Sequence, residues 1–288
     1  MHRVERGGTP YLLALLASAG LLLALTPFRA EAQSWRSVTM SRQVSGETEL
    51  DVKLRFGAGR LTMAPGDGSA LYRMRLRYDE DAFEPLAEYR ENRLELGLKG
   101  IGRGARWRRH DQQELELSLA RNVPMSLDME FGAVRADLDL GGMLLRRLDL
   151  STGASESQVE VSEPNGIRMA SAGFKVGAAD FRVESLGNLN AEQITVDAGV
   201  GRVVLDFGGE WQGDARVAID MGLGSLELRF PKGLGVELVR NTFLTSLDSE
   251  GLVKRGSSYF SPDWEEAVHR VRVNVNAALG SINVVWVH

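Results

Sequence analysis

The feature that most constrains this sequence is a short phrase that it repeats: an alternating apolar segment, a tight glycine turn and a second alternating apolar segment. Two clear copies are Ile194–Leu205 and Val217–Leu228. Apolar residues at every second position are typical of strands with one buried face. The turns begin 21 to 24 residues apart, at Gly132, Gly153, Gly177, Gly199 and Gly222, with further copies at Gly57 and at Ala278-Leu279-Gly280.

This period predicts an all-β protein. A unit of two short strands and two turns cannot bury its apolar face alone, but stacked units bury one continuous core. We therefore expect a β-solenoid of stacked two-strand coils, with a period of about 21–24 residues, over residues 126–288. An antiparallel sandwich or meander is the alternative. The in-phase glycines favour the solenoid, because stacked coils place equivalent residues above one another.

Two segments depart from the repeat. Residues 33–125 alternate between strand and turn patterns, and they predict an antiparallel β extension that is continuous with the stacked coils. Residues 241–270 interrupt the series before Val271 resumes it. Within them, Ser261-Pro262 followed by acidic residues resembles the start of a helix. We expect one short helix there, near the C-terminus, which caps an end or edge of the stack.

The first 32 residues have the pattern of a secretory signal peptide. A basic start with Arg3 and Arg6 precedes an apolar run from Tyr11 to Thr26. Ala30-Glu31-Ala32 fits a cleavage site, so we expect cutting before Gln33. The apolar run is short for a membrane span, and we expect no transmembrane segment after cleavage. An exported chain without cysteine points to the periplasm or cell surface of a bacterium.

Composition excludes several classes of function. The chain carries 34 basic and 39 acidic residues, a net charge of −5, so nucleic acid is not an expected partner. The absence of cysteine excludes disulfides and thiolate chemistry. The turn glycines fit no nucleotide-binding loop, the four histidines form no metal motif, and no nucleophile elbow occurs. We expect no catalytic group, no cofactor and no metal site.

A basic segment, Lys99 to His110, stands out in this acidic chain. It contains five positive charges, three glycines and one tryptophan. Arginine pairs well with oxyanions, and tryptophan stacks on sugar rings. The candidate contacts for an anionic ligand are Arg103, Arg106, Trp107, Arg108 and Arg109. A solvated hairpin loop explains the same composition without any ligand.

A row of outward residues precedes the turns, comprising Glu130, Ser151, Lys175, Asp197, Asp220 and Asn276. In a solenoid, Asp197 and Asp220 lie on adjacent coils. Two stacked carboxylates suit acid–base chemistry or Ca²⁺ binding, although solubility alone also requires outward charges. Trp107, Trp211 and Trp264 fall near turns, where they either contact a partner or cover an end of the core.

The repeated phrases resemble a known bacterial family. Pro124 to Ala133, Leu148 to Ser155 and Val196 to Gly201 are similar to toast-rack domains, which are related to LiaF-like cell-envelope stress proteins and to "putative adhesin" β-repeat domains. Tyr259 to Ala267, followed by Gly280 to Val284, looks like the end of such domains. The resemblance covers residues 46 to 288. It implies an all-β rack outside the cytoplasmic membrane, and it supplies no catalytic residues.

From these observations we expect a non-enzymatic, exported cell-envelope protein that acts through protein or glycan contacts, either adhesin-like or associated with envelope stress. The LiaF-like proteins carry transmembrane helices, which this chain lacks after its signal, so direct regulation of a membrane kinase is not expected. The alternative is a glycan-active β-helix enzyme that uses Asp197 and Asp220. Self-assembly through the ends of the stack is a third hypothesis.

Overall fold

The structure, a computed structural model, describes residues 34–101 and 112–287. The predicted signal peptide, residues 1–32, lies outside these ranges. The described residues form one 16-stranded sheet. Its strands are β1 (Trp35–Gln43), β2 (Leu50–Pro65), β3 (Ala70–Asp79), β4 (Phe83–Arg90), β5 (Arg93–Gly100), β6 (Glu114–Leu119), β7 (Met125–Asp139), β8 (Leu145–Glu160), β9 (Met169–Glu184), β10 (Ala191–Asp206), β11 (Ala215–Pro231), β12 (Gly235–Thr242), β13 (Thr245–Asp248), β14 (Val253–Arg255), β15 (Ser258–Phe260) and β16 (Arg270–Val287).

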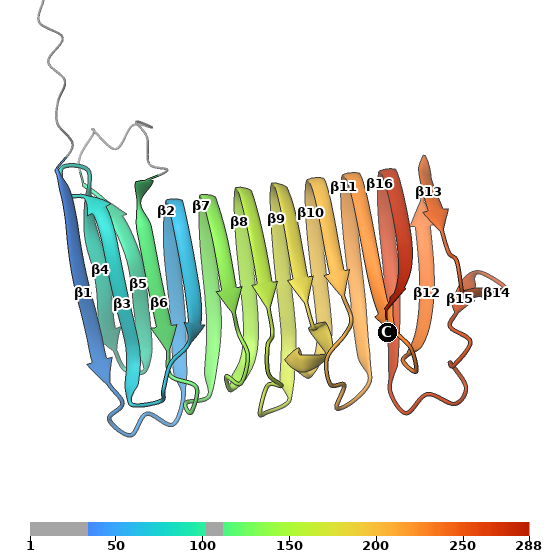
Figure 1. The fold of residues 1–288 in the computed structure, drawn as a ribbon, viewed down its shortest axis with the longest axis horizontal. Coiled ribbons are helices and arrows are strands. Elements are labelled where there is room, and N and C mark those ends of the chain that lie inside the picture. The colour runs from blue at the N-terminus through green and yellow to red at the C-terminus, as the bar shows by residue number, and fades with distance from the viewer. Residues whose placement is uncertain (1–33, 102–111, 288) are drawn as a thin grey trace, which may run out of the picture. The chain divides into compact units, whose positions relative to one another are not determined.

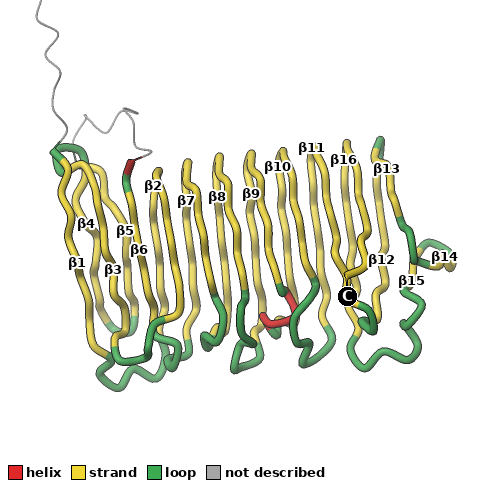
Figure 2. Tube along the Cα trace, in the orientation of Figure 1, coloured by secondary structure: helices red, strands yellow, loops and turns green. Residues whose placement is uncertain are grey.

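The repeats form parallel stacked coils, as the glycine period predicted. Strands β2, β7, β8, β9, β10, β11 and β16 pair in parallel, each with the next. Each phrase is one long strand that bends over at its glycine turn, rather than two separate strands (Figure 1). The longer connections between coils lie at the edge opposite the glycine turns (Figure 2).

The core lies between the two halves of each bent strand. Apolar side chains alternate inward on both halves, so the two halves bury the same interior. Phe174 and Phe181 belong to the two halves of β9, and their ring centroids are 5.6 Å apart. Both rings are almost fully buried. Successive coils extend this core along the stack, which explains why no single unit needs to be stable alone.

The N-terminal extension is antiparallel only at its outer strands β1, β3 and β4, and the parallel coils already begin within residues 33–125, at β2. Strands β5 and β6 together form a coil, because β5 pairs in parallel with the first half of β2 and β6 with the second half. Strand β4 then adds antiparallel to β5, while β3 and β1 add antiparallel to β6. The basic segment therefore connects β5 to β6 at the position where other coils have a glycine turn.

The C-terminal part follows a less regular path. Strand β16 lies between β11 and β12, although β12 precedes it by some thirty residues in the chain. Strands β12 and β13 form the end coil, and β15 and β14 add antiparallel to β12. Residues 241–270 thus complete the end coil and return, so the interruption of the repeat is a change in strand order.

The predicted short helix at Ser261 is wrong. Residues 262–266 form turns, and the 3₁₀ turn Leu186–Leu189 lies elsewhere, between β9 and β10. The Ser261 hydroxyl is buried and does not cap a helix. It accepts a hydrogen bond from the Val236 backbone nitrogen at 2.9 Å and donates to the Leu234 carbonyl at 3.3 Å. Ser261 therefore fastens the returning chain to β12.

Candidate contact surface

The glycine turns stack in register along one edge of the coils. Gly132 lies opposite Gly57, and the column continues through Gly153, Gly177, Gly199 and Gly222 to Ala278, as the flanking residue pairs show. From Gly132 to Gly222, a side chain at these glycines would meet the backbone of the preceding coil. A Cβ at Gly199 would lie 2.7 Å from the Gly177 carbonyl oxygen, and one at Gly222 would lie 2.5 Å from that of Gly199. Close approach of neighbouring coils therefore explains this column without any ligand.

The residue after each of these glycines forms an outward apolar column, which we name the turn ridge. Its members become larger toward the C-terminal end of the stack. They are Ala58, Ala133, Ala154, Ala178, Val200, Leu223, Leu279 and, on the end coil, Leu244. The four large side chains are between 43% and 68% exposed. Contiguous apolar side chains facing solvent on adjacent coils are the kind of patch that marks contact sites.

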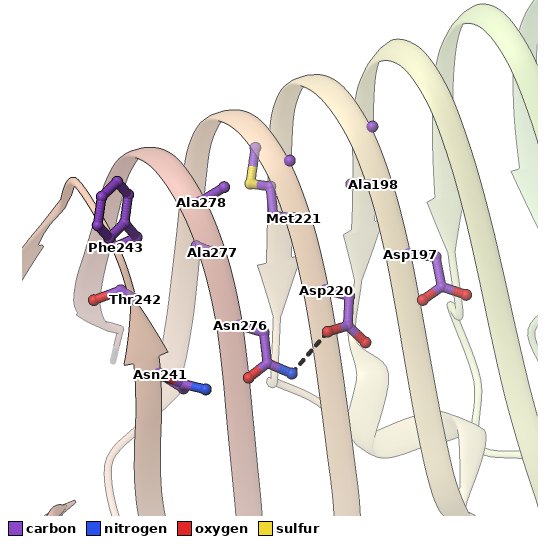
Figure 3. Close-up of a pocket in the computed structure, with 12 residues that line it drawn as sticks. Asp197, Ala198, Asp220, Met221, Asn241, Thr242, Phe243, Asn276, Ala277 and Ala278 are labelled. Atoms are coloured by element: carbon purple, nitrogen blue, oxygen red, sulfur yellow. Dashed lines mark hydrogen bonds between the residues drawn. The ribbon is translucent and has the colours of Figure 1, made fainter.

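A shallow groove runs along the ridge over the last four coils, and we name it the turn groove (Figure 3). Its volume is about 690 Å³, and its lining includes Gly199, Gly222 and Ala278 of the glycine column. Phe243, which is 77% exposed, stands where the other coils have glycine or alanine, and it closes the groove at the end coil. The side away from the ridge is lined by Asp197, Asp220, Asn276, Asn241 and Thr242.

The predicted outward row exists, and it places Asp197 and Asp220 in register on β10 and β11. The Asn276 side-chain amide donates a hydrogen bond of 2.7 Å to Asp220, while neither carboxylate forms an ion pair with any residue that the structure describes. Lys175 is the next residue of the row beyond Asp197, and it lies outside the groove lining. The groove thus presents two carboxylates to solvent.

Some outward carboxylates elsewhere on the coils are paired with cations. Lys53 contacts Asp128 at 3.2 Å and Glu130 at 2.7 Å. Hydrogen bonds from Lys53 hold the pKa of Glu130 below its usual value, and the same bonds raise the pKa of Lys53. At Glu227, burial alone would raise the carboxyl pKa, but hydrogen bonds from Arg229 and Arg202 outweigh it and lower the value. Asp197 and Asp220 form no such ion pair with the described residues, and in this they resemble Asp137 and Asp180 on other coils.

The other predicted candidates have different outcomes. Arg103, Arg106, Trp107, Arg108 and Arg109 lie outside the described residues. Trp211 stacks on Phe207 with ring centroids 6.4 Å apart, and its nitrogen donates to the Phe207 carbonyl. Trp264 packs against Phe260. These two tryptophans therefore cover the core and the returning chain.

The arrangement is suited to contact with an elongated partner. The groove is open along its length, its lining includes Ala198, Met221 and Ala277, and its two sides differ in polarity. In residues 34–101 and 112–287, no group of three or more His, Asp or Glu side chains is placed to hold a metal ion. Sequence reasoning missed the ridge, although its signal stood in the phrase itself: every turn glycine or alanine is followed by alanine, valine or leucine.

Comparison with known families gives one match. Residues 29–180 and 171–229 match the family described as "N-terminal domain of toast_rack, DUF2154". A search of curated proteins gave no match.

Solved structures with a similar arrangement have low sequence identity. One is named a "putative cell adhesion protein" from Clostridium sporogenes; it is 18% identical, with a TM-score of 0.47, and the match covers 88% of this chain and 100% of that one. A "putative adhesin" from Bacteroides fragilis is 10% identical, with a TM-score of 0.31 and coverage of 87% and 97%. A "putative lipid binding protein" from Parabacteroides distasonis is 11% identical, with a TM-score of 0.32 and the same coverage.

Proposed function

Since this chain belongs to the family of toast_rack N-terminal domains, we propose that it is a non-enzymatic, exported protein of a bacterial cell envelope, and that its turn ridge contacts another envelope molecule, protein or glycan. The observation that carries this proposal is the ridge. Outward positions on a stack that faces water are usually polar, yet this column is apolar on every coil whose turn the structure describes, and it bears Val200, Leu223 and Leu279 side by side.

The surroundings of the ridge support a contact role. Polar residues flank it on both sides: Asp197 and Asp220 precede it on their strands, and Arg202 and Ser225 follow it. An apolar centre with a polar rim is typical of sites that bind macromolecules. The open groove and the hydrogen bond that the Asn276 amide donates to Asp220 favour binding over acid–base chemistry, because a catalytic carboxylate is usually set in an enclosed cleft.

Export is tested by the N-terminus of the chain recovered from producing cells. Cleavage at the predicted signal leaves Gln33 as the first residue. N-terminal sequencing and fractionation should therefore find the chain outside the cytoplasm and beginning at Gln33. A chain that begins at Met1 and stays in the cytoplasm would contradict the export part of the proposal. In the structure, no helix of the described residues is long and apolar enough to span a membrane.

The contact role is tested by retention on isolated cell envelopes. A chain with Val200→Ser, Leu223→Ser and Leu279→Ser should be washed off much more readily than the natural chain, by about tenfold or more. Val268→Ser is the matched control, because Val268 is 81% exposed but is not part of the ridge. Equal retention of all three proteins would overturn the proposed role. Release of sugar from envelope polysaccharide that is lost in Asp197→Asn would overturn its non-enzymatic part.

A further inference from the structure

The turn groove and the basic segment are complementary in charge and belong to one chain. The groove presents Asp197 and Asp220 without ion-pair partners among the described residues, beside an apolar ridge. The chain's most basic segment, Lys99 to His110, contains one tryptophan and no acidic residue. Lys99 pairs with Glu84 at 3.1 Å, so the unassigned positive charges of this segment are its four arginines.

The two features lie at different coils of the same edge. The basic segment joins β5 to β6, where the other coils have their glycine turns, and the groove spans β10, β11, β16 and β12. Strands β2, β7, β8 and β9 stand between the two. At about 4.8 Å per parallel strand, the basic segment's coil is about 24 Å from β10 and about 29 Å from β11.

The segment cannot span the groove of its own chain. Its attachment points are Ile101 and Gln112, which both belong to the β5–β6 coil. A backbone connection of this length that must leave and return extends at most about 19 Å from its coil. An extended arginine side chain could cover the remaining distance to Asp197, but it would still stop short of Asp220 and of the coils beyond it. A pairing that occupies the whole groove is therefore a pairing between two copies.

We propose that the turn groove binds the basic segment, Lys99 to His110, of a second copy of this chain. Asp197 and Asp220 take up arginine side chains, and the ridge beside Leu223 and Leu279 takes up Trp107. Because each copy offers one segment and one groove at different coils, the contact is head-to-tail, and it continues from copy to copy. The inference rests on the proposed function, since it names a partner for the same surface.

Sedimentation at increasing concentration tests this with two neutralised variants. The groove variant carries Asp197→Asn and Asp220→Asn, and the segment variant carries Arg106→Gln and Arg108→Gln. The natural chain should associate increasingly with concentration, and less so in high salt, which screens these charges. Each variant alone should associate about tenfold more weakly or remain monomeric. Lys53→Gln, a cation on β2 outside both features, should associate like the natural chain.

Mixing the two variants gives the sharpest result. The groove variant keeps its arginines and the segment variant keeps its aspartates, so only one of the two possible contacts can form between them. The mixture should contain a one-to-one complex and no larger species. A monomeric natural chain at all concentrations would overturn the inference, as would association that survives in the groove variant. Pelleting of a monomeric natural chain with anionic phospholipid vesicles, lost in the segment variant, would instead assign the arginines to lipid.

These outcomes are distinct from failure of the proposed function. Envelope retention that depends on the ridge, together with a monomeric chain, would leave the contact role standing and remove only the second copy as partner. Self-association without envelope retention would support the pairing of two copies and remove the contact with another envelope molecule. Thermal unfolding of each variant checks that the neutral substitutions, all at outward positions or outside the described residues, leave the fold intact.

Discussion

Gly201 and Gly57 both lie at turns of the coils, two residues apart in the phase of the repeat, and their surroundings differ. Gly201 has a φ of 138°, and a Cβ there would collide with the carbonyl of Ala179. A Cβ at Gly57 would meet no described atom within 4 Å. Gly201→Ala should therefore lower the free energy of unfolding by about 2–3 kcal/mol, and Gly57→Ala should change it by less than about 0.5 kcal/mol. Urea denaturation measures both, and equal losses would contradict the assignment.

Lys53 makes stability depend on pH through its two acidic neighbours. The folded pKa of Glu130 lies below its unfolded value of about 4.3, so its stabilising contribution is complete above that pH and disappears as the pH falls through the folded pKa. The pKa of Lys53 is raised, so its contribution is complete below about pH 10.4 and is lost as the pH rises further.

Lys53→Met should therefore flatten the loss of stability between about pH 5 and pH 3, measured by urea denaturation across that range. Lys175→Met is the matched control, because Lys175 is exposed and forms no ion pair with the described residues. If Lys53→Met loses as much stability toward low pH as the natural chain, the ion pairs of Lys53 with Asp128 and Glu130 do not contribute to the free energy of unfolding.

The glycine column was predicted from the sequence. The turn ridge beside it was missed, although the residues that form it repeat with the same period. Equal spacing identifies residues that stack, as Gly177, Gly199 and Gly222 do. Alternation, however, defines which way a residue faces only within a straight strand. At the turn two successive residues face outward, so Leu223 does not follow from the period of two. The outward row already placed Asn276 next after Asp220, but the hydrogen bond between their side chains does not follow from the spacing.

Strand β16 holds the C-terminal coils together because it has neighbours on both sides. It pairs with β11 along its whole length, and with β12 and β13 on its other edge. A chain that ends at residue 269 should lose cooperative unfolding and aggregate, since two apolar edges are exposed at once. A chain that lacks residues 34–43 loses only the edge strand β1 and should still unfold cooperatively. Soluble yield and urea denaturation distinguish the two truncated chains. A chain that ends at residue 269, stays soluble and unfolds cooperatively would contradict the claim that β16 holds the C-terminal coils together.

The order of strands could not be predicted from the repeat. A periodic pattern gives the phase of each coil but is the same whichever coil lies next, so β11-β12-β16 and β11-β16-β12 look alike. The sequence did reveal a break at residues 241–270. The helix expected there failed for a local reason: Ser261 bonds to the backbone of β12, a tertiary contact that overrides its preference for a helix start.

The stack as a whole is a one-dimensional array in which each coil contacts only its neighbours, so damage to one coil should stay local. Phe174 is 1% exposed and packs on Phe181 within β9. Phe174→Ala should cost about 3–5 kcal/mol, whereas Phe243→Ala, at a ring that is 77% exposed, should cost little. Hydrogen exchange in Phe174→Ala should accelerate mainly in β8, β9 and β10, and leave β3 and β16 nearly unchanged. Acceleration spread evenly over all strands would mean that the coils unfold as one unit. Local acceleration would mean that unfolding is cooperative only between neighbouring coils, although the core is continuous along the stack.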